Sequence, residues 1–298
     1  MSEGESYKGL KGIYFKYYKQ LLVLPLILIV ASFAVIAIHY ANTGEFFKKD
    51  VSLKGGVTIT ISQAQNVDLA SLESYLRDKL PAYDVTVRSV GQTGGGVIVE
   101  AGVTEDSEIN SLLAEIENKI GALNKDDYAI QTMGSSLGKN FMREAMTALL
   151  LAFIAMSIVV FIYFRNFVPS ILVIWAVFAD IVCAFAAMIL LDVHISTAGI
   201  AAFLMLIGYS VDTDILLTTR VLKSTEGTVF ERVWGAGKTG LTMTITALIA
   251  VITGLLIGQS DVIRQIMLVL MVGLLFDIFH TWITNAGTLR WYMERKQV

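Results

Sequence analysis

The 298-residue chain contains one cysteine and three histidines. The single cysteine, Cys183, excludes an intrachain disulfide and a cysteine metal cluster, and the wide separation of the histidines argues against a metal site. We therefore expect no metal and no other cofactor. Cys183 falls within an apolar run, where we expect it to pack as a small apolar residue.

Charge and catalytic motifs are also scarce. Charged residues make up 16% of the chain, the net charge is −3 and no basic tail is present, which argues against nucleic acid as a partner. The sequence lacks Gly-x-Ser-x-Gly, His-Glu-x-x-His and Walker patterns. These absences predict that the protein is not an enzyme, and that any energy it uses comes from the membrane gradient or from a partner.

Long apolar runs are what the chain has instead. Hydrophobic residues make up 55% of it and the mean hydropathy is +0.64, which predicts a polytopic α-helical membrane protein. A helix needs about 20 apolar residues to cross a hydrocarbon core of about 30 Å. Six spans are predicted, at Leu21–Tyr40, Met142–Phe164, Pro169–Leu191, Ser196–Leu217, Leu241–Gly258 and Gln265–Leu289.

The short loops predict the orientation. Lysine and arginine precede the first span, lie in the second-to-third and fourth-to-fifth loops, and follow the sixth span, whereas the alternate short loops hold little positive charge. Positive loops stay cytoplasmic, and no cleavage pattern follows the first run. We expect a multi-pass protein of the cytoplasmic membrane. Its predicted parts are a cytoplasmic N-terminus (1–20), a first membrane helix (21–40), an extracytoplasmic domain (41–140), five more membrane helices (141–290) and a cytoplasmic C-terminus (291–298).

The segment 41–140 predicts a small ferredoxin-like domain. Its strand and helix patterns alternate in the order βαββαβ. Gly94-Gly95-Gly96 is interpreted as a hairpin turn rather than a phosphate cradle, because no helix N-terminus follows it directly. The six expected elements are Val57–Ser62, Asp68–Leu80, Asp84–Val90, Gly96–Ala101, Glu105–Ile120 and Tyr128–Met133.

Acids inside the predicted spans are the strongest indication of function. A charged acid at the centre of a membrane helix costs about 2.5–3.5 kcal/mol, so four unpaired acids would cost about 10 kcal/mol, comparable to the stability of a whole protein. Each acid should therefore be protonated, paired, or turned toward a water-filled crevice within the bundle. The residues concerned are Asp180, Asp212, Asp214 and Asp277, with His280 near the last.

Asp212 and Asp214 lie two residues apart, about 200° around a helix, and so cannot share one face. We expect Asp212 to be the protonatable centre and Lys238, which begins the fifth span, to be its counter-charge. Asp180 and Asp214 are expected to act as supporting or relay groups. Static bonding between helices is the alternative for all of these acids. It is favoured for the possible secondary polar pair Asp277 and His280.

The fourth span resembles the SecF family of the Sec protein-export machinery, in its archaeal form. Ile207-Gly208-Tyr209-Ser210-Val211-Asp212-Thr213-Asp214, followed by Arg220, is similar to the family's Gly-Tyr-Ser-x-Asn-Asp-Thr stretch with its following arginine. The resemblance covers nearly the whole chain. Three further motifs of the family have a counterpart here. Asp180 matches the acid of the third span, Lys238-Thr239 with Thr242 resembles the Arg-Thr-x-x-Thr pattern of the fifth span, and Gly55-Gly56 resembles an early Gly-Gly.

Several positions depart from the bacterial pattern of the family. The acid that follows the Gly-Tyr-Ser stretch is displaced by one position, about 100° around the helix, so that Asp212 aligns with the acid of the companion SecD and of RND transporters. Lys238 replaces an arginine, and Ser52 stands where the early motif has an acid. Asp277 and His280 fall where bacterial relatives carry small and hydroxyl residues.

The resemblance implies an accessory subunit that promotes protein export. Its expected partners are a SecD-like subunit, a SecY-type channel, the translocating unfolded polypeptide and the lipid membrane. The two subunits together would form a twelve-span RND-like unit coupled to the proton gradient, and six spans with half-satisfied charges agree with one half of a pseudo-symmetric unit. The alternatives are a self-sufficient RND-type transporter of small molecules or ions, and a passive scaffold held by helix packing.

Overall fold

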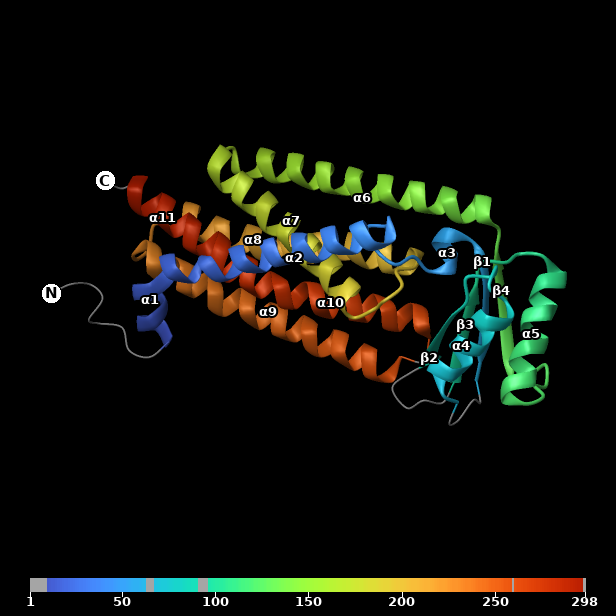
Figure 1. Ribbon diagram of the computed structural model, residues 1–298. Coiled ribbons are helices and arrows are strands. Elements are labelled where there is room, and N and C mark those ends of the chain that lie inside the picture. The colour runs from blue at the N-terminus through green and yellow to red at the C-terminus, as the bar shows by residue number, and fades with distance from the viewer. Residues whose placement is uncertain (1–9, 63–66, 91–95, 259, 297–298) are drawn as a thin grey trace.

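Six helices of the computed structural model, which describes residues 10–62, 67–90, 96–258 and 260–296, are long and apolar enough to cross a membrane. The sixth runs over Asp261–Arg295 and contains a π-helical segment, η2, between two α-helices. A short helix, α1 (Leu10–Leu21), precedes them. The helices are α2 (Val23–Thr43), α6 (Ser135–Phe164), α7 (Phe167–Leu190), α8 (Thr197–Lys223), α9 (Val229–Ile257), and α10 (Asp261–Phe279) with η2 (His280–Asn285) and α11 (Ala286–Lys296) (Figure 1).

The six predicted spans are confirmed, but several helices extend beyond the apolar runs. α6 begins at Ser135 rather than Met142, and α9 begins at Val229 rather than Leu241. Hydropathy marks only the apolar part of a helix, whereas backbone hydrogen bonding continues through polar turns. The 30 residues of α6 are about 45 Å long, which exceeds the hydrocarbon thickness. α6 therefore projects from the bundle toward the domain (Figure 1).

The bundle has a buried centre and an apolar outside. α7 and α8 are largely buried, whereas α2, α6 and α9 turn many large apolar side chains outward, as lipid contact requires. α8 and α10 approach closely because α10 carries Gly273, where an added Cβ would lie 2.5 Å from Leu206 Cδ1. The interior between these helices is thus tightly packed and shielded from lipid.

Between α2 and α6 the chain forms the predicted ferredoxin-like domain. The antiparallel sheet has the strand order β2-β3-β1-β4, with two helices over one face. The elements agree with the predicted βαββαβ order, although Gly94 and Gly95 of the expected hairpin turn lie outside the described residues. They are β1 (Gly56–Ile61), α4 (Leu69–Lys79), β2 (Thr86–Val90), β3 (Gly96–Ala101), α5 (Asp106–Ile120) and β4 (Tyr128–Met133).

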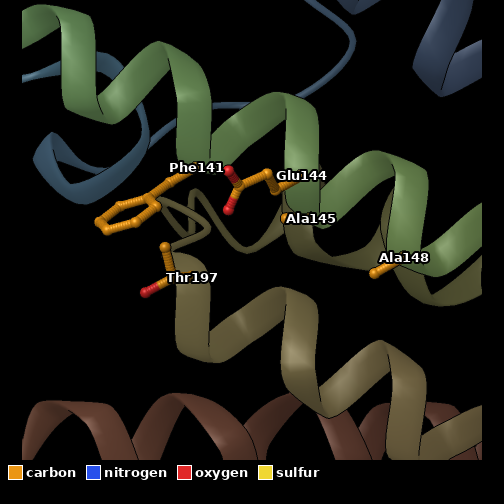
Figure 2. Close-up of a pocket in the computed structure, with 5 residues that line it drawn as sticks. All are labelled: Phe141, Glu144, Ala145, Ala148 and Thr197. Carbon is orange, nitrogen blue, oxygen red and sulfur yellow. The ribbon is translucent and has the colours of Figure 1, made fainter.

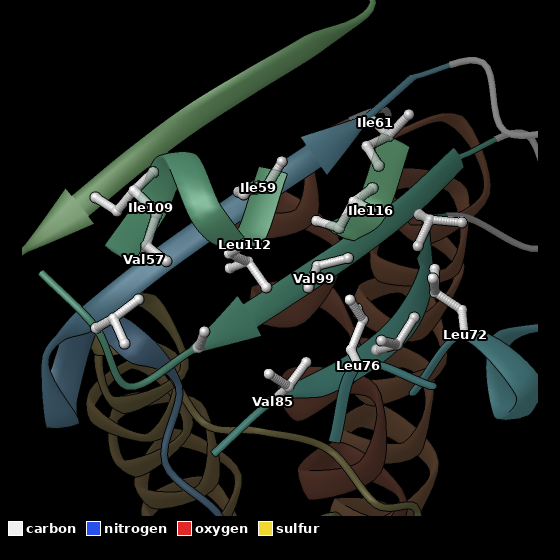
Figure 3. Close-up of a cluster of buried hydrophobic side chains, with 14 residues drawn as sticks. Val57, Ile59, Ile61, Leu72, Leu76, Val85, Val99, Ile109, Leu112 and Ile116 are labelled. Carbon is white, nitrogen blue, oxygen red and sulfur yellow. The ribbon is translucent and has the colours of Figure 1, made fainter. Parts of the chain in front are cut away.

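The two faces of the sheet differ in chemistry. Alternate residues of β3 point to opposite faces, and Val97 and Val99 join Leu112 and other aliphatic side chains in a core beneath the two helices (Figure 3). The opposite face of the sheet is the one nearer the helix bundle (Figure 1). Ile98 and Glu100, which alternate with the two valines and so point to that face, are also buried. A buried acid on the bundle side of the sheet is therefore a feature of the junction between the two parts of the molecule.

A short helix, α3 (Val51–Lys54), and two glycines join the domain to the bundle. Gly55 and Gly56 have φ of +86° and +133°, which side chains rarely adopt. A Cβ on Gly55 would lie 2.4 Å from the Cα of Ser135, the first residue of α6. The predicted Gly-Gly motif thus permits the first strand to pass against the start of α6.

Candidate functional site

A polar cluster lies inside the helix bundle. Its eight side chains come from α7, α8, α10 and η2, and none is more than 5% exposed. Three of them are carboxylic acids and one is a histidine. Because buried polar groups are costly without partners, the bonding within this group determines what the site can do. We call it the membrane cluster: Asp180, Ser210, Thr213, Asp214, Asp277, His280, Thr281 and Asn285.

One half of the membrane cluster is centred on Asp180 of α7. Its Oδ2 accepts a 2.6 Å hydrogen bond from the Ser210 hydroxyl of α8, and its Oδ1 lies 2.6 Å from His280 Nδ1. The other ring nitrogen, Nε2, lies 3.9 Å from Cys183 Sγ, which also accepts a 3.3 Å hydrogen bond from the Ser32 hydroxyl of α2. This half connects four parts of the bundle through one carboxylate and one imidazole.

The other half joins two acids through hydroxyl groups. Thr281 Oγ1 lies 2.9 Å from Oδ1 of Asp214 and 2.9 Å from Oδ1 of Asp277. Asn285 Nδ2 donates to Asp214 Oδ1 at 2.7 Å. Thr213 Oγ1 lies 3.2 Å from both oxygens of Asp277. The two acids, from α8 and α10, therefore share one hydroxyl bridge.

The single hydrogen of the Thr281 hydroxyl limits what this bridge can be. A threonine hydroxyl has a single hydrogen to donate, so Thr281 can donate to only one of its two acids. For both contacts to be hydrogen bonds, the other carboxyl must donate to Thr281 and must itself be protonated. Among the described residues no lysine or arginine forms an ion pair with Asp214 or Asp277. The arrangement thus suits a proton that is shared between two acids.

The pairing expected between Asp277 and His280 does not form. His280 bonds Asp180 on α7, whereas Asp277 bonds the hydroxyls of α8 and η2. The physical reason is that η2 packs against α7, where the Asp180 carboxylate lies 2.6 Å from the His280 ring, while the hydroxyls of Thr213 and Thr281 bond Asp277. A π-helical turn is itself often found at functional sites, and it supplies His280, Thr281 and Asn285 to the membrane cluster.

The position of η2 is held by its own aromatic residue. Trp282 packs against Gly240 of α9, where an added Cβ would lie 2.2 Å from Trp282 Cζ2. The Trp282 carbonyl accepts a 2.9 Å hydrogen bond from the Tyr14 hydroxyl of α1. A side chain larger than hydrogen at position 240 would therefore displace η2, and with it the histidine and hydroxyl groups of the membrane cluster.

Buried atoms without a partner lie within and beside the membrane cluster. In the described part of the chain, Asp214 Oδ2 and Asn285 Oδ1 have no hydrogen-bond partner, and neither does Thr218 Oγ1, one turn along α8. Such atoms are uncommon in folded proteins. They leave Asp214 with capacity for one more hydrogen bond, so its bonding can change without the loss of an existing contact.

The other predicted acid of α8 lies elsewhere. Asp212 and Asp214 occupy different faces, as expected: Asp214 is fully buried and Asp212 is exposed. Asp212 belongs to an exposed face of α8 with Gly208 and Tyr209, the latter 48% exposed. Lys238 is also exposed, and in the described ranges it forms no ion pair with Asp212. The structure therefore does not bring the proposed centre and its counter-charge together.

The remaining motif residues with side-chain hydrogen bonds donate to backbone carbonyls of the helices and not to the acids of the membrane cluster. Arg220 Nη1 donates to the Gly235 carbonyl at 2.9 Å, which ties α8 to α9. Thr239 and Thr242 donate to carbonyls of their own helix, those of Gly235 and Lys238. These contacts are structural in kind.

An open cavity of about 380 Å³ lies between α6 and α8 at the domain end of the bundle (Figure 2). It begins beside Thr197, the first residue of α8, and the exposed Glu144 of α6 is its one acid. Asp214 is 17 residues farther along α8, about 25 Å away along the axis. The cavity is therefore separate from the membrane cluster. Its lining is Phe141, Glu144, Ala145, Ala148 and Thr197.

Several members of the membrane cluster are not predicted by the sequence. Thr213, Thr281 and Asn285 carry no charge, and such residues are ordinary in membrane helices, where their hydroxyls and amides bond other helices. The spacing of Thr281 and Asn285 was also uninformative, because the π-helix departs from the α-helical period. A search for polar residues near Asp277 would have found Thr281, four residues farther on.

A family model described as "Protein export membrane protein SecD/SecF, C-terminal" matches residues 113–295. The chain is similar to the protein-export membrane protein SecF of Methanolacinia petrolearia, with 39% identity over 280 residues that cover 93% of this chain and 94% of that protein. It is similar to SecF of Methanothermobacter thermautotrophicus, with 39% identity over 284 residues and 94% of both chains covered.

Solved structures share the fold. The crystal structure of SecDF, a translocon-associated membrane protein from Thermus thermophilus, matches with a TM-score of 0.76 and 19% identity over 98% of this chain. SecDF in the super-membrane-facing form matches with a TM-score of 0.58 and 20% identity over 95% of this chain. The present chain spans only 40% and 39% of those longer chains. At these identities the likeness shows the fold alone.

Proposed function

Because this chain belongs to the SecD/SecF family of protein-export membrane proteins, we propose that it is an accessory subunit that works with a SecD-like partner to promote the export of unfolded polypeptides, coupled to the proton gradient. The observation that carries the proton coupling is the shared hydroxyl of Thr281 between Asp214 and Asp277. A proton can be held there, in a protein interior, without a fixed cation.

The membrane cluster can convert proton movement into helix movement. Protonation or release at Asp214 and Asp277 changes which group donates through Thr281, and so changes the bonds that hold α8, α10 and η2 together. A proton that crosses 100 mV releases about 2.3 kcal/mol, enough to shift a two-state equilibrium about fiftyfold. Asp180 and His280 form a second exchangeable pair, linked to α8 through Ser210.

Asp212 and Lys238 retain a proposed role at the edge of the subunit. An exposed acid in a membrane-spanning helix is costly in lipid, so we assign the face of α8 that holds Asp212, Gly208 and Tyr209 to the SecD-like partner. There Asp212 would relay charge between the two halves of a twelve-span unit. Lys238, near the positive loop before the apolar part of α9, would be its counter-charge in another state of the cycle.

The proposed topology completes this assignment. Both termini lie in the cytoplasm and the ferredoxin-like domain lies outside the cytoplasmic membrane, because the positive loops gather on the side opposite the domain. The domain would then stand where exported polypeptide emerges from a SecY-type channel. The similarity in fold to translocon-associated SecDF supports this arrangement.

The proposal is tested by replacing each acid with its amide. We expect Asp214→Asn to reduce the gradient-dependent part of export at least tenfold in membranes that contain the partner subunits, because the bridge can no longer exchange its proton. Asp212→Asn should have a smaller effect on export and should weaken association with the partner. Export without a gradient should be unchanged in both variants.

The alternatives predict different results. A passive scaffold would show the same contribution to export with and without the proton gradient. A self-sufficient transporter would move a small solute in liposomes that contain this chain alone. Unchanged gradient-dependent export in Asp214→Asn, together with normal assembly, would overturn the proposed proton role.

A further inference from the structure

A second group of charged side chains lies at the junction between the domain and the bundle. Arg88 of β2 and Glu100 of β3 point to the bundle side of the sheet, and Asp50 precedes α3 on the chain segment that arrives from α2. We call Asp50, Arg88 and Glu100 the junction cluster. It joins the rigid sheet to the segment that connects the domain to the membrane helices.

In the junction cluster two carboxylates share one guanidinium. Arg88 Nη2 donates to Glu100 Oε1, and it also donates to Asp50 Oδ2 at 3.1 Å. Glu100 is only 1% exposed, and within the described residues its Oε2 has no hydrogen-bond partner. With both acids ionised the cluster carries one uncompensated negative charge in a buried place, which is unfavourable.

Burial raises the pKa of Glu100 to about 7, an effect that Arg88 opposes and the Asp50 carboxylate reinforces. The other titratable groups nearby do not neutralise the extra negative charge of the junction cluster, because they pair with other residues or are themselves uncharged. Lys54 of α3 pairs with Asp84 at 3.2 Å, and Lys48 pairs with Asp192. Burial and the nearby Arg88 lower the pKa of His194, so that its ring adds no positive charge at neutral pH.

We propose that Glu100 is a second proton-binding site, outside the membrane-spanning helices, and that the bound proton fastens the domain to the segment at Asp50. A protonated Glu100 can donate its O–H to the Asp50 carboxylate while Arg88 still bonds both residues. Loss of the proton replaces that contact with repulsion between two carboxylates. The junction is therefore tight when the proton is bound and looser when it is released.

The segment at Asp50 is in turn attached to the start of α8. The Asp50 N–H donates to the Ile195 carbonyl at 3.0 Å, and the Thr197 N–H donates to the Ser52 hydroxyl at 3.2 Å. Ile195 lies two residues before α8, and Thr197 is the first residue of that helix, which also carries Asp214. Proton binding at Glu100 would thus couple the domain to α8, the helix that carries Asp214. This coupling does not require proton flow through the membrane.

Infrared titration of the full chain in nanodiscs tests proton binding directly. Wild-type protein should show a carboxylic acid band that disappears as the pH rises through neutral. This band should be absent from Glu100→Gln and present in Glu105→Gln, the same change at an exposed acid of the domain. In Asp50→Asn the midpoint should move to lower pH, because a repelling charge is removed. Carboxylic acid bands that are the same in wild-type protein and in Glu100→Gln at every pH would overturn the assignment, whereas bands from the membrane acids occur in both and cancel in the difference.

Distance measurements test whether the bound proton holds the domain in one position relative to the bundle. Spin labels at Asn110→Cys on α5 and Leu190→Cys at the end of α7, both exposed positions, report the disposition of the domain relative to the bundle. The distance distribution should narrow as the pH falls through neutral, and Glu100→Gln should give the narrow distribution at every pH. Distributions that do not change with pH in the wild-type protein would refute the coupling. Export activity plays no part in either result, so failure here is distinct from failure of the proposed function.

Discussion

The membrane cluster and the junction cluster bury acids in two different ways. In the bundle, Asp214 and Asp277 are bridged by neutral hydroxyl and amide groups and have no lysine or arginine partner among the described residues. At the junction, Glu100 and Asp50 share Arg88, which is itself about one-third exposed. A cationic side chain is costly at the centre of a membrane-spanning bundle, whereas at the junction Arg88 keeps part of its side chain exposed. The comparison indicates that each location restricts which kind of partner can stabilise an acid.

Removing the cation should have the largest effect. We expect Arg88→Gln to destabilise the domain by about 3 kcal/mol above neutral pH, because it leaves two carboxylates without a counter-charge. The loss should be smaller below neutral pH. The raised pKa of Glu100, about 7 against an ordinary 4.5, means that the folded protein takes up a proton as the pH falls and the repulsion ends.

Thermal unfolding of the detergent-solubilised protein, followed at both pH values, would measure this effect. Lys125→Gln provides the control, since Lys125 is an exposed lysine of the same domain and should change stability by less than about 0.5 kcal/mol. Equal losses above and below neutral pH would contradict the proposed titration of Glu100.

A methyl group at Gly240 should disturb the membrane cluster without touching any acid. Its Cβ would lie 2.2 Å from Trp282 Cζ2, so we expect Gly240→Ala to displace η2 at a cost of about 2 kcal/mol and to reduce gradient-dependent export. Gly237→Ala on the same helix is the matched control, because its added Cβ would meet Trp282 only at an ordinary contact distance of 3.6 Å. The two variants are compared by thermal unfolding and by export assay. Similar behaviour of both would show that the position of η2 is not restricted by Trp282.

The smallest change in stability is expected for the hydroxyl bridge itself. Thr281→Val keeps the shape of the side chain and removes the group between Asp214 and Asp277, at a cost of about 1 kcal/mol, while gradient-dependent export should fall strongly. Thr253→Val removes a hydroxyl that only bonds its own helix, at Ile249 O, and should leave both unchanged. A large loss of stability with normal export would make the bridge purely structural.

Much of the fold follows from local patterns. The apolar runs predicted six spans, and the alternation and helical spacing of aliphatic residues predicted the βαββαβ order that the sheet confirms. The start of α9 was missed by twelve residues because a polar helix such as Val229–Lys238 is held by a capping box at Thr228 and by its neighbours, not by hydropathy. The π-helix had no signal in the sequence, because it departs from the regular α-helical period.

The sequence by itself determined which acids lie inside the membrane and that Asp212 and Asp214 face different ways, because both follow from span length and from the angle per residue of a helix. Only the tertiary structure decided which acids meet. Partners such as Asp180 and His280, or Asp214 and Thr281, lie 100 and 67 residues apart in the chain, and their contact depends on how three helices pack. Likewise, nothing local distinguishes Glu100 from other strand acids until the sheet is laid against the bundle and water is removed from one of its faces.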